Sequence, residues 1–165
     1  APLCGLRRLM GFRADHNSID DISALANNAD LSSISLNSCM VSALEPLRAL
    51  RGLQSLELSS NRISDIEPLR SLVNLESLIL DDNQIEDLGP LAGLTRLQRL
   101  SVDHNPLVEP PEDVVRGGPE AVRSYFKLRA AGEEGEKRDE SENRGRGFPV
   151  TARAVHTPAS YRTQN

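Results

Sequence analysis

The chain has 165 residues and a formal net charge of -5, which suits one domain of ordinary size and disfavours nucleic acid as a partner. Hydrophobic residues make up 38% of the sequence but aromatic residues only 3%, so an aliphatic core is expected and a sandwich or barrel is disfavoured. Cys4 and Cys39 show no disulfide or metal-ligand spacing, and no run of about 18 apolar residues indicates a membrane span. We therefore expect a cytoplasmic protein that does not bind a membrane.

Residues 1–8 match the second half of a unit that recurs later in the chain. Pro2 and Leu3 occupy the same positions as Pro90 and Leu91, four units of 22 residues further on. A chain that begins inside a unit would expose an apolar coil end. We expect at least one further repeat before Ala1 in the intact protein, and a monomer apart from end-on association through the uncapped N-terminal coil.

Five units of 22 residues follow from residue 9 to about residue 110, without an insertion. Each begins with the pattern L-x-x-L-x-L, whose alternation predicts a strand with one buried face. The first unit is the weakest, because Phe12, Ala14 and Asn28 stand where the other units have mostly leucine. The leading column is Leu9, Leu31, Leu53, Leu75 and Leu97.

A polar column follows each predicted strand and is interpreted as structural. An asparagine amide donates and accepts, so successive side chains can satisfy buried backbone groups between coils. Cys39 can take the same place as a small residue with a weak donor. The column consists of Asn17, Cys39, Asn61, Asn83 and Asn105.

Proline recurs in the second half of the units, at Pro46, Pro68 and Pro90. A fixed φ and a missing N–H are tolerated in a short turn or 3₁₀ stretch, and 22 residues leave no room for a regular α-helix. Each coil is therefore expected to have a strand on one side and irregular or 3₁₀ structure on the other.

The pattern changes after residue 110. Prolines and glycines delimit two short helical pieces over residues 111–131, in which Val115, Val122 and Phe126 are candidates to cover the last coil. Residues 132–165 are rich in charged residues, glycine and serine, so a disordered charged tail is expected there.

The units "LQSLELSSNRISDIEPLRSL" and "LESLILDDNQIEDLGPLAGL" resemble leucine-rich repeats of the short 22-residue class, as in internalins and the regulatory subunit of protein phosphatase 1. The strings N-P-L-x-x-P-P-E and G-x-E-A-V-x-x-Y-F resemble the end of intracellular leucine-rich arrays, including those of Roco-type GTPases. The resemblance implies an α/β solenoid with one parallel concave sheet, a 3₁₀ or irregular convex side and a C-terminal helical cap.

We find no pattern that predicts catalysis, a cofactor or a metal site. No phosphate-binding G-x-x-x-x-G-K-[ST] follows the repeats, and no serine has a histidine and an acid placed to activate it. His16 and His104 share a column but lie four units apart, too far to chelate one ion. The chain is therefore not expected to be an enzyme by itself.

The outward strand positions predict a partner-binding surface on the concave face, since solenoids present variable side chains on a fixed backbone. Ile79 is a candidate apolar anchor, and the acids beside it favour a protein partner with a basic surface. The candidate residues are Arg13, Asp15, Asn37, Glu57, Ser59, Ile79, Asp81, Asp82, Arg99 and Asp103.

The predicted function is protein binding as a scaffold or adaptor. One alternative is that the chain is the recognition segment of a larger signalling enzyme, such as a Roco-type GTPase or a kinase. Another is an internalin-like surface adhesion protein. The phosphatase-regulator resemblance does not extend to phosphatase binding, because the concave face lacks aromatic anchors.

Overall fold

The computed structural model describes residues 9–145 of the chain. The partial unit over residues 1–8 and the part of the predicted tail from residue 146 lie outside these residues. The contacts divide the chain into two units, Ala1–Ala130 and Ala131–Asn165, so the boundary falls inside the last helix.

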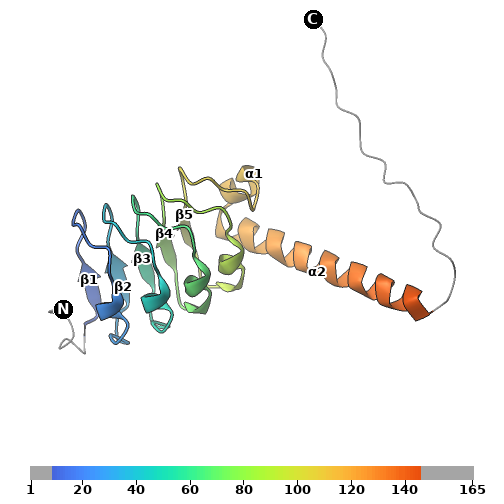
Figure 1. Cartoon of the computed structure of the whole chain (residues 1–165), viewed down its shortest axis with the longest axis horizontal. Helices are drawn as coiled ribbons and strands as arrows, with labels where there is room; N and C mark the ends of the chain where they lie inside the picture. The colour runs from blue at the N-terminus through green and yellow to red at the C-terminus, as the bar shows by residue number, and fades with distance from the viewer. Residues whose placement is uncertain (1–8, 146–165) are drawn as a thin grey trace, which may run out of the picture. The chain divides into compact units, whose positions relative to one another are not determined.

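Five short strands form one parallel sheet in chain order (Figure 1). Each strand pairs with the next at a spacing of 22 residues, so that Phe12 lies beside Ile34 and Ile34 beside Leu56. The strands predicted from the alternating pattern and the parallel sheet implied by the resemblance are therefore confirmed. The strands are β1 (Gly11–Arg13), β2 (Ser33–Ser35), β3 (Ser55–Glu57), β4 (Ser77–Ile79) and β5 (Arg99–Ser101).

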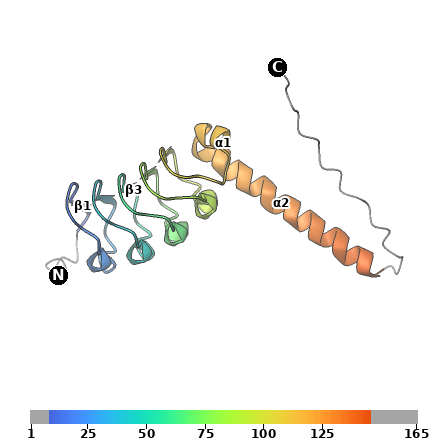
Figure 2. The same cartoon turned by 45° about the horizontal axis from the view of Figure 1, so that its top comes forward.

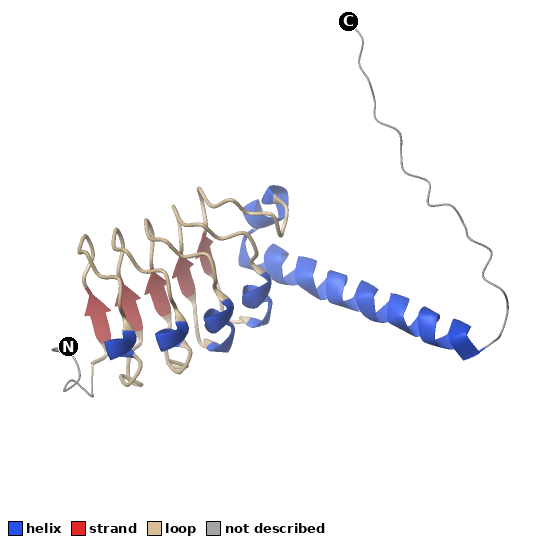
Figure 3. Cartoon of the chain, in the orientation of Figure 1, coloured by secondary structure: helices blue, strands red, loops and turns tan. Residues whose placement is uncertain are grey.

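Four 3₁₀ helices form the return half of the coils, away from the strands (Figures 2 and 3). In three of them the recurring proline stands in the first turn, where its missing N–H breaks no helical hydrogen bond. The predicted 3₁₀ structure is therefore present. The helices are η1 (Ser23–Leu25), η2 (Glu45–Leu47), η3 (Glu67–Ser71) and η4 (Gly89–Gly93).

The core is a stack of aliphatic columns between the sheet and the 3₁₀ helices. Leu56, Leu58 and Leu78 are 0% exposed, and burial of each such side chain contributes about 2 kcal/mol. The first coil is looser, because Phe12 and Ala14 are only partly buried. Asn28 is buried in a leucine column, and its Oδ1 has no hydrogen-bond partner within the described residues.

Two α-helices follow the repeats, α1 (Glu112–Arg116) and α2 (Gly118–Gly145). Val115 and Phe126 pack against the core, and Val122 is 1% exposed. Arg123 ties the start of α2 to the last coil, since its Nη1 donates to the carbonyl of Leu97 at 3.0 Å. These residues cap the array as the sequence suggested.

The α2 helix continues beyond the boundary that was expected at residue 131. The sequence predicted a disordered tail from residue 132, whereas the backbone is helical as far as Gly145. Residues 133–144 are dominated by glutamate, lysine and arginine, which have high helix propensity even where no apolar face is present. Low hydrophobicity was therefore a poor guide to local helix formation here.

Candidate functional site

The candidate site is the strand face, which we define as the solvent side of the five-stranded sheet and of the turn after each strand. Successive coils place equivalent residues side by side, so that Ser35, Glu57, Ile79 and Ser101 form one row across the sheet. The backbone sets the spacing of this row, and the side chains determine its chemistry.

Asp15 lies at the N-terminal end of the strand face with little exposure. Its carboxylate accepts hydrogen bonds from the Ser35 hydroxyl at 2.7 Å, the Asn37 backbone N–H at 2.8 Å and the Arg13 side chain at 2.6 Å. These bonds, that of Ser35 most of all, lower the pKa of Asp15 to about 2. Arg13 is exposed beside it.

The same arrangement recurs at the other end of the face. The Asp81 carboxylate accepts the Ser101 hydroxyl at 2.6 Å and the Asp103 backbone N–H at 2.8 Å. Between them, Asn37 accepts the Ser59 backbone N–H at 2.8 Å through its Oδ1. Asp15, Asn37 and Asp81 therefore each join their own coil to the next one.

Sequence reasoning placed these three residues among the partner contacts and missed their role between coils. A signal was available: an Asp in this column is followed 20 residues later by a serine, at Asp15 with Ser35 and at Asp81 with Ser101. The carboxylate oxygens that bind the next coil are less available to a partner, although the residues lie on the strand face.

Ile79 lies at the middle of this face, in β4. Its side chain is half-buried between Glu57 of β3 and Ser101 of β5, with Asp81 two residues further along the same chain. Glu57 and Ser59 are also half-buried, and Arg99 is exposed. The structure thus gathers an apolar side chain and carboxylates on one surface.

The edge of the strand face has a left-handed backbone. His16, Ser38, Ser60, Asp82 and His104 all have φ between 54° and 58°, the region that permits the tight turn after each strand. Asp82 and His104 are exposed neighbours on adjacent coils, with Nδ1 of His104 3.1 Å from Oδ1 of Asp82.

The asparagine column lies beneath this edge and bonds between coils. In the third coil, Nδ2 of Asn61 donates to the carbonyls of Leu36 at 2.8 Å and Leu58 at 2.9 Å, and its Oδ1 accepts the Val41 N–H at 3.0 Å. Asn83 and Asn105 repeat these bonds. Among the described residues, Asn17 donates only to carbonyls of its own turn, and Cys39 makes two weak contacts to carbonyls.

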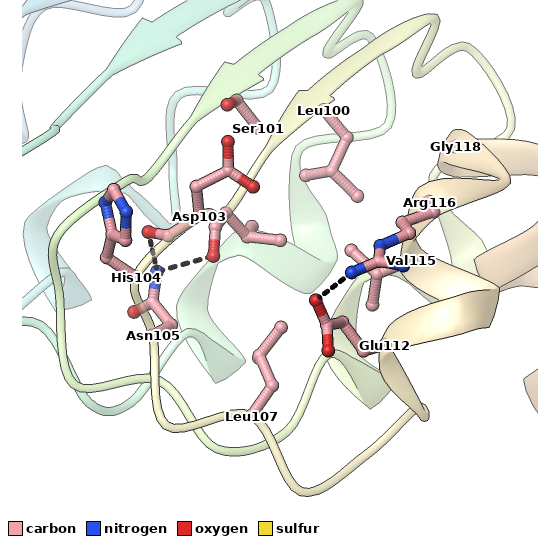
Figure 4. A pocket seen from close by; sticks show the side chains of 11 residues that line it. Leu100, Ser101, Asp103, His104, Asn105, Leu107, Glu112, Val115, Arg116 and Gly118 are labelled. Carbon is pink, nitrogen blue, oxygen red and sulfur yellow. Dashed lines mark hydrogen bonds and ion pairs between the residues drawn. The ribbon is translucent and has the colours of Figure 1, made fainter.

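A hollow of about 410 Å³ lies beside β5, in the range of ligand-sized pockets. Figure 4 shows Ser101, Asp103 and His104 on one side and Val115 and Arg116 of α1 on the other. Arg116 is paired with Glu112 at 2.6 Å. A second hollow of about 400 Å³ lies on the return side, between residues 64–67 and 84–90.

The described residues contain no cluster of three or more His, Cys, Asp or Glu side chains that could hold a metal ion. Among the helices that the structure describes, none has both the length and the apolar composition to cross a membrane. The hydrogen bonds and apolar surface of the strand face are suited to noncovalent contact with another surface.

Similar known proteins support the assignment of the 22-residue units as leucine-rich repeats. A family model described as leucine-rich repeats in two copies matches residues 51–92 and 73–114. A search of curated proteins gave no significant match. Solved structures of leucine-rich repeat proteins match over most of the described residues.

Two internalins from Listeria monocytogenes are among these structures. Internalin inlF is 30% identical, with a TM-score of 0.65, over 74% of this chain and 35% of that chain. Internalin C2 is 30% identical, with a TM-score of 0.61, over 66% of this chain and 48% of that chain. The chain therefore spans about a third to a half of their length.

A third match is to the complex of BIR3 and SERK2 from Arabidopsis thaliana, with 25% identity, a TM-score of 0.54 and coverage of 63% of this chain and 61% of that chain. The family match, the 22-residue register and the coil geometry agree with one another. This chain is a leucine-rich repeat protein, and its repeats from residue 9 to about residue 110 stack as an α/β solenoid with a C-terminal helical cap.

Proposed function

We propose that this chain is a protein-interaction module that binds a partner protein on the strand face. The observation that carries the proposal is Ile79, a half-buried apolar side chain in the middle of a polar sheet. An apolar side chain surrounded by polar groups is a common anchor of protein interfaces. A role as a scaffold or adaptor and a cytoplasmic location stay predictions.

The carboxylates around Ile79 favour a partner with basic side chains. Glu57 lies directly beside Ile79, while Asp82 and Asp103 are exposed at the adjacent edge. Arg13 and Arg99 are the exposed basic residues among the candidates, and Arg13 is paired with Asp15 at 2.6 Å. Complementary charge adds specificity and speeds association more than it adds affinity.

The three matched structures bear on this proposal in two different ways. The match to the BIR3–SERK2 complex supports a protein partner, because that structure is of two proteins bound to each other. The two internalins support a second candidate, an internalin-like surface recognition module. A segment of a Roco-type GTPase or a kinase stays a prediction from the sequence.

The test compares capture of partners by the full chain and by two variants. Ile79→Ser removes the apolar anchor, and Val73→Ser is the matched control, since Val73 is an apolar residue that is 51% exposed outside the strand face. We expect Ile79→Ser to weaken binding of the captured partner about tenfold. Val73→Ser should leave the affinity unchanged.

Titration calorimetry with the purified partner measures both affinities, and thermal melts show that both variants are folded. Glu57→Gln should slow association at low salt with a smaller effect at high salt. Equal affinity of wild type and Ile79→Ser for every captured partner would refute this placement of the site.

A further inference from the structure

One of the two edges of the described sheet lies at β5, and the preceding coils show which hydrogen bonds this edge lacks. After each of the first four strands, two backbone N–H groups donate to the next coil. Leu80 donates to the carbonyl of Ser101 at 2.8 Å, and Asp82 donates to that of Asp103 at 2.9 Å. The equivalent residues after β5 are Val102 and His104, whose N–H groups have no acceptor within residues 9–145.

Within the described residues, the carboxylate of Asp103, at this edge, also lacks the hydrogen bonds that its equivalent in the preceding coil accepts. Asp81 accepts both the hydroxyl of Ser101 and the backbone N–H of Asp103 from the next coil. Asp103 is the next residue of that column, and no hydrogen bond from residues 9–145 reaches its exposed carboxylate. The N–H groups of Val102 and His104 and the carboxylate of Asp103 therefore lie in one row. Their spacing is the one at which each earlier coil binds the strand that follows it.

Space is present where that strand would lie. The 410 Å³ hollow separates β5 from α1, and Figure 4 shows the edge of the sheet facing it. Leu100, Leu107 and Val115 line it as half-buried apolar side chains. An inward apolar side chain of an added strand would pack against them, as the leucines pack between coils.

We propose that the β5 edge is a docking site for an extended segment of a partner protein, which adds a sixth parallel strand to the sheet. This site differs from the strand-face site in that it does not use Ile79, although Asp82 and Asp103 lie at the border of both. Addition of a strand to a free sheet edge supplies main-chain hydrogen bonds, and alternate side chains supply specificity.

The strands of the repeats indicate which residues a partner segment needs in order to pair with the β5 edge. Ser35-Leu36-Asn37 and Ser101-Val102-Asp103 dock on the preceding coil through the serine hydroxyl and through the N–H of the third residue. The partner segment is therefore serine or threonine, an aliphatic residue, and a third residue with a free N–H. Its first and third carbonyls accept from Val102 and His104. The acids Asp82 and Asp103 favour lysine or arginine as the third residue.

The test uses the full chain and a synthetic peptide, acetyl-Val-Ser-Leu-Lys-Val-amide. The matched control is the same peptide with a methyl group on the backbone nitrogen of lysine, which removes the donor to Asp103. We expect the unmodified peptide to bind at least tenfold more tightly. Amide hydrogen exchange of Val102 and His104, followed by NMR, should slow at least tenfold when that peptide is saturating.

Two protein variants locate the site. Asp103→Ala should weaken peptide binding about tenfold without loss of stability, because its carboxylate is exposed and holds no other coil. Ile79→Ser should leave peptide binding unchanged, so failure of this proposal and failure of the strand-face proposal are distinguishable.

Equal binding of the two peptides, or no binding at millimolar concentration, would overturn the proposal. Slow exchange of Val102 and His104 without peptide at high dilution would mean that the chain covers its own edge, which also overturns it. Slow exchange that appears only as the protein concentration rises would assign the edge to a second copy of the chain instead.

Discussion

At the scale of single residues, Cys39 is the position where the asparagine column is weakest. Its thiol reaches the carbonyl of Ala14 at 3.5 Å, whereas Asn61 makes four bonds of 3.2 Å or less one coil further on. The N–H of Ile19, equivalent to that of Val41, has no partner within the described residues.

We therefore expect Cys39→Asn to raise the free energy of unfolding by about 1 kcal/mol, since the new amide can accept from Ile19 and donate to Ala14. Urea denaturation measures the change. Cys39→Ala, which adds no acceptor, is the control and should not stabilise the protein. A loss of stability in Cys39→Asn would show that the second coil has no room for the asparagine.

Asp15 gives a prediction about pH. Its pKa is lowered from 3.8 to about 2 in the folded chain, chiefly by the hydroxyl of Ser35. A lowered pKa means that the ionised carboxylate stabilises the fold above about pH 4, and that this contribution is lost as the pH falls toward 2. Asp15→Asn should therefore be less stable than wild type at pH 6 and should approach it near pH 2.

Thermal melts across this pH range measure the difference. Asp20→Asn is the control, because Asp20 is exposed and its side chain makes no hydrogen bond within the described part of the chain. That variant should follow the wild-type curve. A difference between Asp15→Asn and wild type that does not change with pH would exclude ionisation of Asp15 as the cause.

At the scale of elements, the start of α2 holds the end of the array. Val122 is 1% exposed against the core, while Leu128 on the same helix is 74% exposed. Val122→Ala should lower the free energy of unfolding by about 2 kcal/mol, because it leaves a cavity at the cap. Leu128→Ala should change it by less than about 0.5 kcal/mol. Similar losses in urea denaturation would mean that α2 does not cover the last coil.

At the scale of the whole molecule, the stability of a solenoid is a sum over coils and their interfaces. The first described coil contributes least, because Phe12 and Ala14 are partly exposed and Asn28 is buried with an unpaired oxygen. Amide exchange should therefore be faster at Ala14 and His16 than at their equivalents Leu58 and Ser60.

Asn28→Leu tests this explanation, because it gives the first coil the leucine that the later coils have in this column, at Leu50, Leu72 and Leu94. It should slow exchange of the first coil several-fold and leave that of the third coil nearly unchanged. Exchange that is uniform along the array, in both proteins, would show that the coils unfold as one cooperative unit.

The repeating pattern of residue types was enough to predict the structure of one coil. Leucine at fixed columns set the buried face, the spacing of 22 set the register of β1–β5, and recurring prolines indicated the 3₁₀ turns. These features were predictable because each depends on residue type and on a period that repeats along the chain. The asparagine column was predictable for the same reason.

The contacts of the strand face and of the two ends could not be predicted from the repeat and became clear only from the folded chain. It engaged the oxygens of Asp15, Asn37 and Asp81 in bonds between coils, left Val102 and His104 unpaired within the described residues, and extended α2 to Gly145. A hydrogen bond depends on the position of a partner 20 or 22 residues away. A repeat pattern gives every coil the same role, but an end differs from the middle because one neighbour is replaced by the cap.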